Sequence, residues 1–183
     1  MGKLDHKVAV ITGGARGLGQ AMAVAFAKEG ATVIAADMSE LTYTEKNVFG
    51  YHLNITDVDA VKAFFDEVVA KYGKIDILVN NAGYALPDAF EKNSVEDEEN
   101  CIRVLGTSVI SLTKLFVRKM IKNNHGKIMI VSSVAAFAPP AAIQVMYGPI
   151  KTFMNRFNDA LNINYNSKGI TSTALCPGYT VTN

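Results

Sequence analysis

The chain has few cysteines, almost no net charge and no long apolar segment at its start. Its two cysteines, Cys101 and Cys176, lie far apart and form no CxxC pair, so neither a disulfide framework nor a zinc site is indicated. Eighteen basic side chains nearly cancel seventeen acidic ones, and the formal net charge of +1 provides no strong field for nucleic acid or anionic lipid. Residues 1–6 are short and polar, unlike a signal peptide or membrane helix. We therefore expect a cytoplasmic protein with no nucleic-acid or membrane partner.

The positions of the histidines and the length of the chain bear on metal binding and on the number of domains. His6, His52 and His125 are scattered, and we expect no metal site. A chain of 183 residues that is 49% hydrophobic can bury a sizeable core. No linker, repeat or low-complexity tract interrupts it. We expect a single domain over residues 1–183.

Short apolar runs alternate with segments of helical periodicity along the chain. The expected strands are residues 8–11, 32–36, 51–53, 75–79, 128–131 and 170–175. The expected helices run from the glycine-rich turn to Gly30, from an N-cap at Thr56 to Gly73, over residues 105–120, and onward from Tyr147. The polar, acidic segment 87–100 leads into the expected helix over residues 105–120, and the link between strands two and three looks short for a full helix. Apolar strands separated by helices predict an α/β fold, a Rossmann-like doubly wound parallel sheet with helices on both faces.

A glycine-rich turn joins the first expected strand to the first helix. Gly13, Gly17 and Gly19 give the spacing GxxxGxG, and the amides at the N-terminus of the following helix suit a phosphate. A Cβ atom at these glycines would block the tight turn and the close approach of a pyrophosphate. The pattern favours a dinucleotide site, although a glycine-rich connection without a ligand can have the same spacing.

Two side chains near this turn bear on the identity of the cofactor. Asp37 closes the second expected strand, where a carboxylate can accept hydrogen bonds from the adenosine ribose and repel a 2′-phosphate. Arg16 precedes Gly17, and its guanidinium can pair with such a phosphate or lie in solvent. Asp37 favours NAD over NADP, and NAD is the cofactor that we expect.

Tyr147 and Lys151 are four residues apart at the start of the last expected helix, so their side chains share one face. An ammonium beside the phenol would stabilise the phenolate and lower its pKa from about 10. The same spacing also fits an exposed Tyr–Lys pair without a function. Ser133 ends the fifth expected strand, where its hydroxyl can orient a substrate oxygen, because ligands of open parallel sheets bind beyond the carboxyl ends of the strands. Pro149 requires the helix to begin at or just before Tyr147.

The ordered set of motifs resembles the short-chain dehydrogenase/reductase family, of the classical type. The matching motifs are TGGARGLG at residues 12–19, NNAG at residues 80–83, Ser133, Tyr147 with Lys151, and Pro177-Gly178. The resemblance spans nearly the whole chain. Each motif alone is weak, whereas their order and their positions at strand ends are specific together.

The resemblance implies an oxidoreductase that transfers a hydride between a nicotinamide dinucleotide and a small carbonyl or alcohol substrate. Tyr147 would be the general acid/base, Lys151 would lower its pKa and hold the nicotinamide ribose, and Ser133 would hydrogen-bond the reacting oxygen. Asn54 lies where many relatives have an aspartate that meets the adenine amino group, and Thr182 matches a position near the nicotinamide amide. The resemblance also implies a homo-oligomer, a dimer or tetramer, formed through the two long helices. The implied cofactor-binding residues are Gly13, Arg16, Gly17, Leu18, Gly19, Asp37, Asn54, Ile55, Asn81, Ala82, Gly83, Tyr147, Lys151, Pro177, Gly178 and Thr182.

The chain departs from the family pattern at two places. Arg103 stands three residues before Gly106, where the family usually has an asparagine that relays protons through water from the active-site lysine. A second cation near Lys151 would favour a low tyrosine pKa but could block the water, and Asn100 could substitute for the missing asparagine. The chain also ends at Asn183, several dozen residues before most relatives, so the substrate-covering helix and a final strand would be missing and the sixth strand would be an exposed edge.

Other interpretations stay open on these grounds. A catalytically impaired NAD(P)-binding protein, or a fragment that lacks the substrate lid, would keep the cofactor site without turnover. An extended relative acting on nucleotide-linked sugars shares the tyrosine and lysine but usually has a different glycine spacing. The apolar loop at residues 135–146 fits a modestly apolar ketone, aldehyde or secondary alcohol, or merely packs.

Overall fold

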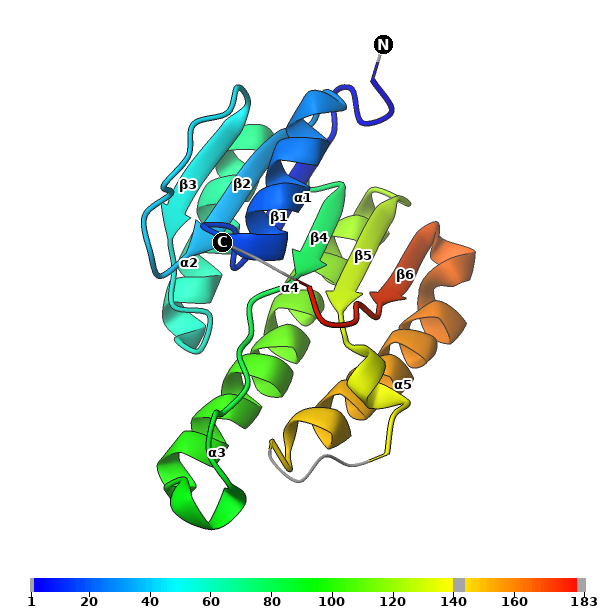
Figure 1. The fold of residues 1–183 in the computed structure, drawn as a ribbon. Helices are drawn as coiled ribbons and strands as arrows, with labels where there is room; N and C mark the ends of the chain where they lie inside the picture. Colours follow the sequence, from blue (N-terminus) through cyan, green and yellow to red (C-terminus); the bar gives the residue numbers. More distant parts are fainter. Residues whose placement is uncertain (1, 140–143, 181–183) are drawn as a thin grey trace.

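The computed structural model describes residues 2–139 and 144–180. Within these residues one parallel sheet has the strand order β3-β2-β1-β4-β5-β6. The chain order reverses between β1 and β4, which is where open α/β sheets form a crevice beyond the carboxyl ends of their strands (Figure 1). The strands are β1 (Val8–Thr12), β2 (Thr32–Asp37), β3 (Val48–His52), β4 (Ile77–Asn80), β5 (Gly126–Val131) and β6 (Ile170–Leu175).

Helices cover both faces of the sheet. Helix α1 packs on one face through Ala23 and Ala27, and α2, α4 and α5 pack on the other (Figure 1). The doubly wound α/β fold expected from the sequence is confirmed. The helices are α1 (Gly17–Lys28), α2 (Val58–Tyr72), α3 (Val95–Ile102), α4 (Ser108–Lys122) and α5 (Tyr147–Tyr165), with a π-helical turn at Arg103–Thr107 and short 3-10 turns at Phe90–Lys92, Val134–Ala136 and Asn166–Lys168.

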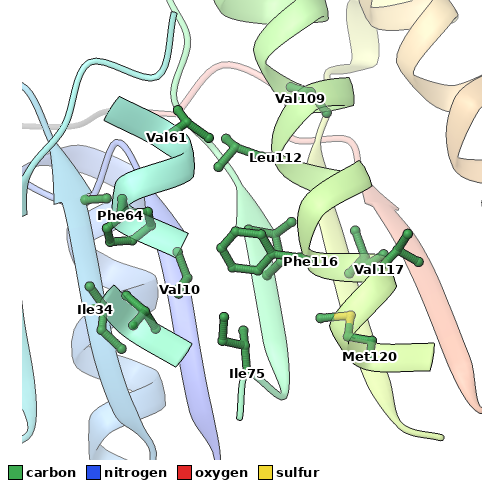
Figure 2. Packing of buried hydrophobic residues seen from close by; sticks show 14 of the residues in the cluster. Val10, Ile34, Val61, Phe64, Ile75, Val109, Leu112, Phe116, Val117 and Met120 are labelled. Carbon is green, nitrogen blue, oxygen red and sulfur yellow. The ribbon is translucent and has the colours of Figure 1, made fainter. Parts of the chain in front are cut away.

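The larger core lies between the sheet and helices α2 and α4. Phe64 of α2 and Phe116 of α4 are completely buried, and Figure 2 shows them among Val10 and Ile34 from the strands. The Phe116 ring also meets the Phe65 ring edge to face, with 5.2 Å between the centroids. This packing fixes α4 on the sheet and thereby places the preceding helical turns beside the carboxyl ends of the strands.

Two strand boundaries differ from those expected. The third strand is Val48–His52 rather than residues 51–53, because β3 lies at the edge of the sheet, is at most half-buried and has no continuous apolar run. The fourth strand is Ile77–Asn80 rather than residues 75–79, so Asn80 belongs to the strand and pairs with Ile130 of β5. As expected, no helix joins β2 to β3.

The starts of two helices also differ from those expected. Thr56 is not the N-cap of α2: the Asp57 carboxylate caps it and accepts hydrogen bonds from the Asp59 and Ala60 amides at 3.0 Å each. Helical structure begins within the polar segment 87–100 rather than at residue 105: α3 starts there with a reciprocal capping box of Ser94 and Asp97. Most residues of α3 are polar or acidic, so its sequence shows no apolar residues at helical spacing.

Strand β6 forms one edge of the sheet in the part of the chain that the structure describes. Its outer side is occupied by a side chain from α5: the Asn162 amide donates to the Ser172 carbonyl and accepts from the Ser172 amide, at 2.8 Å each. The Ser172 hydroxyl donates to Asn158 Oδ1 at 2.7 Å. These bonds tie the end of the sheet to α5.

One continuous helical stretch, Val95–Lys122, is long and apolar enough to cross a bilayer by length and composition. A helix in the core of a sheet protein meets the same test. Half of this apolar window is buried in the fold, where Leu112 and Phe116 pack on the sheet. The apolar side chains of this stretch thus form part of the hydrophobic core.

Candidate active site

A cleft of about 1090 Å³ opens at the carboxyl ends of the strands. All the candidate cofactor and catalytic residues within the described chain line it, from Gly13 at the end of β1 to Gly178 after β6. Thr182 lies outside the described residues. Among the residues that the structure describes, no group of three or more His, Cys, Asp and Glu side chains is placed to hold a metal ion. The candidates in the cleft are Gly13, Arg16, Gly17, Leu18, Gly19, Asp37, Asn54, Ile55, Asn81, Ala82, Gly83, Ser133, Tyr147, Lys151, Pro177 and Gly178.

The glycine turn forms a cradle that side chains would fill. Gly13 and Gly17 have φ angles of 66° and 57°, which L side chains rarely adopt. A Cβ on Gly13 would lie 2.8 Å from the Cα of Ala82, and one on Gly19 would collide with the Gly13 carbonyl. The N-cap of α1 is Arg16, which makes no side-chain capping bond, and no acidic residue occupies the first turn. The amides at this end therefore suit an anion that approaches the backbone closely, as a pyrophosphate does.

The cradle is held from β4 by hydrogen bonds that connect two strand ends. Asn81 Nδ2 donates to the carbonyls of Thr12 at 2.9 Å and Gly13 at 3.0 Å. The Thr12 hydroxyl accepts from the Asn81 and Ala82 amides at 3.1 Å each. Thr12 is the first residue of the matched glycine motif, but the sequence gave no role to its hydroxyl. Asn81 both lines the cleft and fixes the shape of the glycine turn.

Asp37 ends β2 at the rim of the same cradle. Its carboxylate accepts from the Ala15 amide at 3.0 Å and the Ser39 amide at 2.9 Å. A carboxylate can accept about four hydrogen bonds, so these two orient the group and leave acceptor sites for a ribose. Tyr43 was not identified from the sequence: its hydroxyl donates to the Gly14 carbonyl at 2.9 Å and ties the β2–β3 connection to the turn. Its partner is far away in the sequence, so no local pattern indicated it.

Asn54 and Thr56 form a turn at the adenine side of the expected site. The Asn54 Oδ1 atom accepts from the Thr56 amide at 3.0 Å and the Thr56 hydroxyl at 2.8 Å. These bonds use both lone pairs of the oxygen that was expected to meet an adenine amino group. Asn54 lines the cleft, but such a contact has to replace one of the bonds to Thr56.

Tyr147, Lys151 and Ser133 meet at the other end of the cleft. Tyr147 is the first residue of α5, and Lys151, one turn later, has 6% of its surface exposed. The Lys151 ammonium donates to the Val131 carbonyl at 2.7 Å and lies 5.4 Å from the centroid of the Tyr147 ring. Ser133 follows β5, and the buried Ser132 hydroxyl donates to the Lys151 carbonyl at 3.2 Å. The end of β5 therefore positions the lysine.

The protonation of this pair differs from the sequence expectation. Burial raises the pKa of Tyr147, the hydrogen bond with Ser133 lowers it, and Cys101 raises it further, so the net direction is upward. The expected lowering by Lys151 is not among the causes. Burial lowers the pKa of Lys151 to about 8, against smaller upward effects of Cys101 and Cys176. In this structure the phenol therefore holds its proton at neutral pH.

Arg103 does not place a second cation beside Lys151. Its guanidinium lies 3.2 Å from the Glu99 carboxylate, with both side chains largely exposed, while Asn100 and Val104 line the cleft. Arg103 begins the π-helical turn and extends to the outside of the helix. Asn100 instead donates from Nδ2 to the Tyr84 hydroxyl at 2.8 Å.

The sequence as a whole matches known proteins along almost its entire length. Residues 7–183 match the family model of short chain dehydrogenases. The chain belongs to the short-chain dehydrogenase/reductase family. It is 32% identical over 187 residues to the 3-oxoacyl-[acyl-carrier-protein] reductase FabG of Buchnera aphidicola subsp. Schizaphis graminum, covering 99% of this chain and 76% of that protein. It is also 32% identical over 185 residues to FabG of Escherichia coli K12, covering 98% and 75%.

Solved structures agree with this assignment. A short-chain dehydrogenase/reductase from Burkholderia xenovorans matches with a TM-score of 0.91 at 27% sequence identity, covering 99% of this chain and 77% of that one. The family resemblance expected from the motifs is confirmed. Members of this family are oxidoreductases that use nicotinamide cofactors and act on small molecules.

Proposed function

We propose that the protein transfers a hydride between a nicotinamide dinucleotide and a carbonyl or alcohol substrate. One observation supports this most strongly: a single cleft joins the amide-lined start of α1 to Tyr147, Lys151 and Ser133. The first end fits a pyrophosphate because glycines allow a close approach to the backbone and the start of α1 has no side-chain cap among the described residues. The second end carries a phenol, an ammonium and a hydroxyl, which can bind an oxygen and move a proton.

In the direction of reduction, this chain supplies the proton and a bound nicotinamide supplies the hydride. Ser133 orients the substrate oxygen and Tyr147, which holds its proton because burial raises its pKa, donates that proton to the oxygen as negative charge develops there. The Lys151 ammonium then stabilises the phenolate that remains. Its bond to the Val131 carbonyl keeps the ammonium on the same side of α5 as Tyr147.

We propose NAD as the cofactor in preference to NADP. The Asp37 carboxylate, held by the Ala15 and Ser39 amides, cannot turn away from a ligand without losing both bonds. A 2′-phosphate at this place would face a fixed negative charge, whereas ribose hydroxyls can donate to it. Replacing Asp37 with Ser should therefore weaken NADH binding about tenfold, for one charge-assisted hydrogen bond of about 1.5 kcal/mol, and strengthen NADPH binding, so the ratio of the two Kd values should change by more than about tenfold. Calorimetric titration with each nucleotide measures this ratio.

The test of the proposed chemistry compares wild type with Tyr147→Phe in the oxidation of NADH by a panel of ketones and aldehydes. Loss of the acid/base group should lower kcat by at least about 100-fold, while NADH binding persists. Tyr165→Phe, at the far end of α5, is the matched control and should retain full activity. Turnover that is unaffected by Tyr147→Phe would refute the assignment.

The main alternative is a nicotinamide-binding protein without turnover. One argument for it was that Arg103 could disturb the active site. Arg103 instead pairs with Glu99 and does not line the cleft. Binding of NADH with no turnover of any carbonyl in the panel would favour this alternative.

We also propose a homo-oligomer in the cytoplasm, formed through α4 and α5. Their outer sides expose Ile110, Phe153 and Ile163, the last with 83% of its surface accessible. Apolar side chains of this size on two neighbouring helices suit contact with a second copy. Light scattering of the purified protein measures the oligomeric state, and a monomer at micromolar concentration would contradict the proposal.

A further inference from the structure

Tyr84 and Asn100, both exposed residues, form a hydrogen-bonded pair that lines the cleft. Tyr84 follows the NNAG motif after β4, and Asn100 lies on α3. Asn100 Nδ2 donates to the Tyr84 hydroxyl at 2.8 Å, and both residues line the same cleft as Tyr147. Cys101, the residue after Asn100, belongs to a buried cluster against which Tyr147 packs, which places the pair near the reacting end.

The pair offers one donor and one acceptor to a ligand. Since Tyr84 already accepts from Asn100, its own O–H proton is available to donate, and Oδ1 of Asn100 is available to accept. Neither atom has another hydrogen-bond partner in residues 2–139 and 144–180. Burial raises the pKa of Tyr84, the Asn100 bond lowers it, and Cys101 and Asp97 raise it further. The hydroxyl therefore remains a donor at physiological pH.

The charges around this pair disfavour an anion. The segment 84–103 contains six carboxylates and two basic side chains, Lys92 and Arg103, of which Arg103 pairs with Glu99. The Asp97 charge acts on the Tyr84 hydroxyl, so part of this negative field extends to the pair. A carboxylate or phosphate bound there would face like charges. The carboxylates are Asp88, Glu91, Glu96, Asp97, Glu98 and Glu99.

We propose that Tyr84 and Asn100 select substrates by binding an uncharged hydroxyl group that the substrate carries in addition to the group that reacts at Tyr147. A hydroxyl is both a donor and an acceptor, and it matches the two atoms that the pair presents. The preferred substrates are then hydroxyketones or, in the reverse direction, diols. This inference rests on the proposed function and names the substrate class of the same site.

The experiment measures kcat/KM for a five-carbon methyl ketone, for the same ketone with one hydroxyl at each successive carbon, and for the keto acid levulinate. Wild type should prefer one hydroxyketone over the plain ketone and should use levulinate least. In Tyr84→Phe and Asn100→Leu this preference should fall roughly three- to tenfold, the effect of one net hydrogen bond. The matched controls Tyr165→Phe and Asn164→Ala, both outside the cleft, should keep the wild-type preference.

The outcomes separate this inference from the proposed function. Turnover of the ketones with no preference for a hydroxyl, or a preference that survives both Tyr84→Phe and Asn100→Leu, overturns the substrate assignment alone. Preference for levulinate also overturns it. No turnover by wild type with any ketone overturns the proposed function and, with it, this inference. Calorimetric binding of the preferred hydroxyketone to the NADH complex of Tyr147→Phe should weaken when Tyr84→Phe is added, a readout that does not depend on turnover.

Discussion

Replacement of Lys151 by Met should stabilise the fold while it removes the proposed activity. The Lys151 ammonium is almost completely buried, and its pKa is lowered from 10.5 to about 8. At neutral pH both the folded and the unfolded chain carry the proton, so a pKa lowered by this much costs about 3 kcal/mol of folding free energy. Met has a similar length and no charge. Loss of the charge-assisted hydrogen bond to the Val131 carbonyl costs about 2 kcal/mol, which leaves a net gain of about 1 kcal/mol.

The gain should also depend on pH in a defined direction. Between about pH 8 and pH 10.5 the folded wild type loses the Lys151 proton while the unfolded chain keeps it, so the stability of wild type rises with pH in this window. The difference between Lys151→Met and wild type should therefore shrink by about 2 kcal/mol between about pH 7 and pH 9.5.

Urea unfolding at the two pH values measures both effects, provided that the m-value is unchanged. Lys114→Met is the matched control, because Lys114 is an exposed residue within α4 and its replacement should change stability by less than about 0.5 kcal/mol. If Lys151→Met is less stable than wild type by more than about 1 kcal/mol at pH 7 while the control is neutral, the ammonium stabilises the fold and the reasoning is wrong.

Three further predictions concern the site and the core. Because burial raises the pKa of Tyr147, the rate of alcohol oxidation, which needs the phenolate, should still be rising at about pH 9, and a plateau reached by about pH 7 would contradict this. Thr12→Val removes the hydroxyl that accepts from the Asn81 and Ala82 amides, and it should lower the free energy of unfolding in urea by about 2 kcal/mol. It should also weaken NADH binding in calorimetry. An unchanged Kd would mean that these bonds do not shape the cradle. Phe116→Ala leaves a cavity in the core and should cost about 3–5 kcal/mol in urea unfolding, and a cost below about 1 kcal/mol would contradict the packing described.

The fold was predictable where burial is complete. Strand β1 is buried at every residue, so its sequence is a continuous apolar run that glycines terminate. Strand β3, at the edge, gave a weak signal because its residues are at most half-buried. The sequence of helix α3 showed no apolar pattern of helical spacing, because only Cys101 of its eight residues is buried. The spacing of apolar residues in a sequence reflects which side chains are buried. Helices and strands that bury few side chains therefore cannot be predicted from it.

The grouping of the candidate residues in one cleft was predictable where these residues are close in sequence or at strand ends. Tyr147 and Lys151 are four residues apart on one helix, and the glycine spacing is local. Thr12, Tyr43 and Tyr84 act through partners up to 70 residues away, which only the fold brings near. The protonation of the Tyr147 and Lys151 pair was also beyond the sequence, because burial, rather than their spacing, has the largest effect on both pKa values.

The amide of Asn162 on the outer side of β6 affects how this molecule meets other strands. A residue of a parallel ladder directs both its N–H and its C=O to one side, and at Ser172 that side faces away from β5. Any strand that joins the sheet here, from the same chain or from another molecule, must first displace this amide and give up two hydrogen bonds. In the described residues the Asn162 amide thus occupies the backbone groups of Ser172 that an open strand edge would otherwise present to another strand.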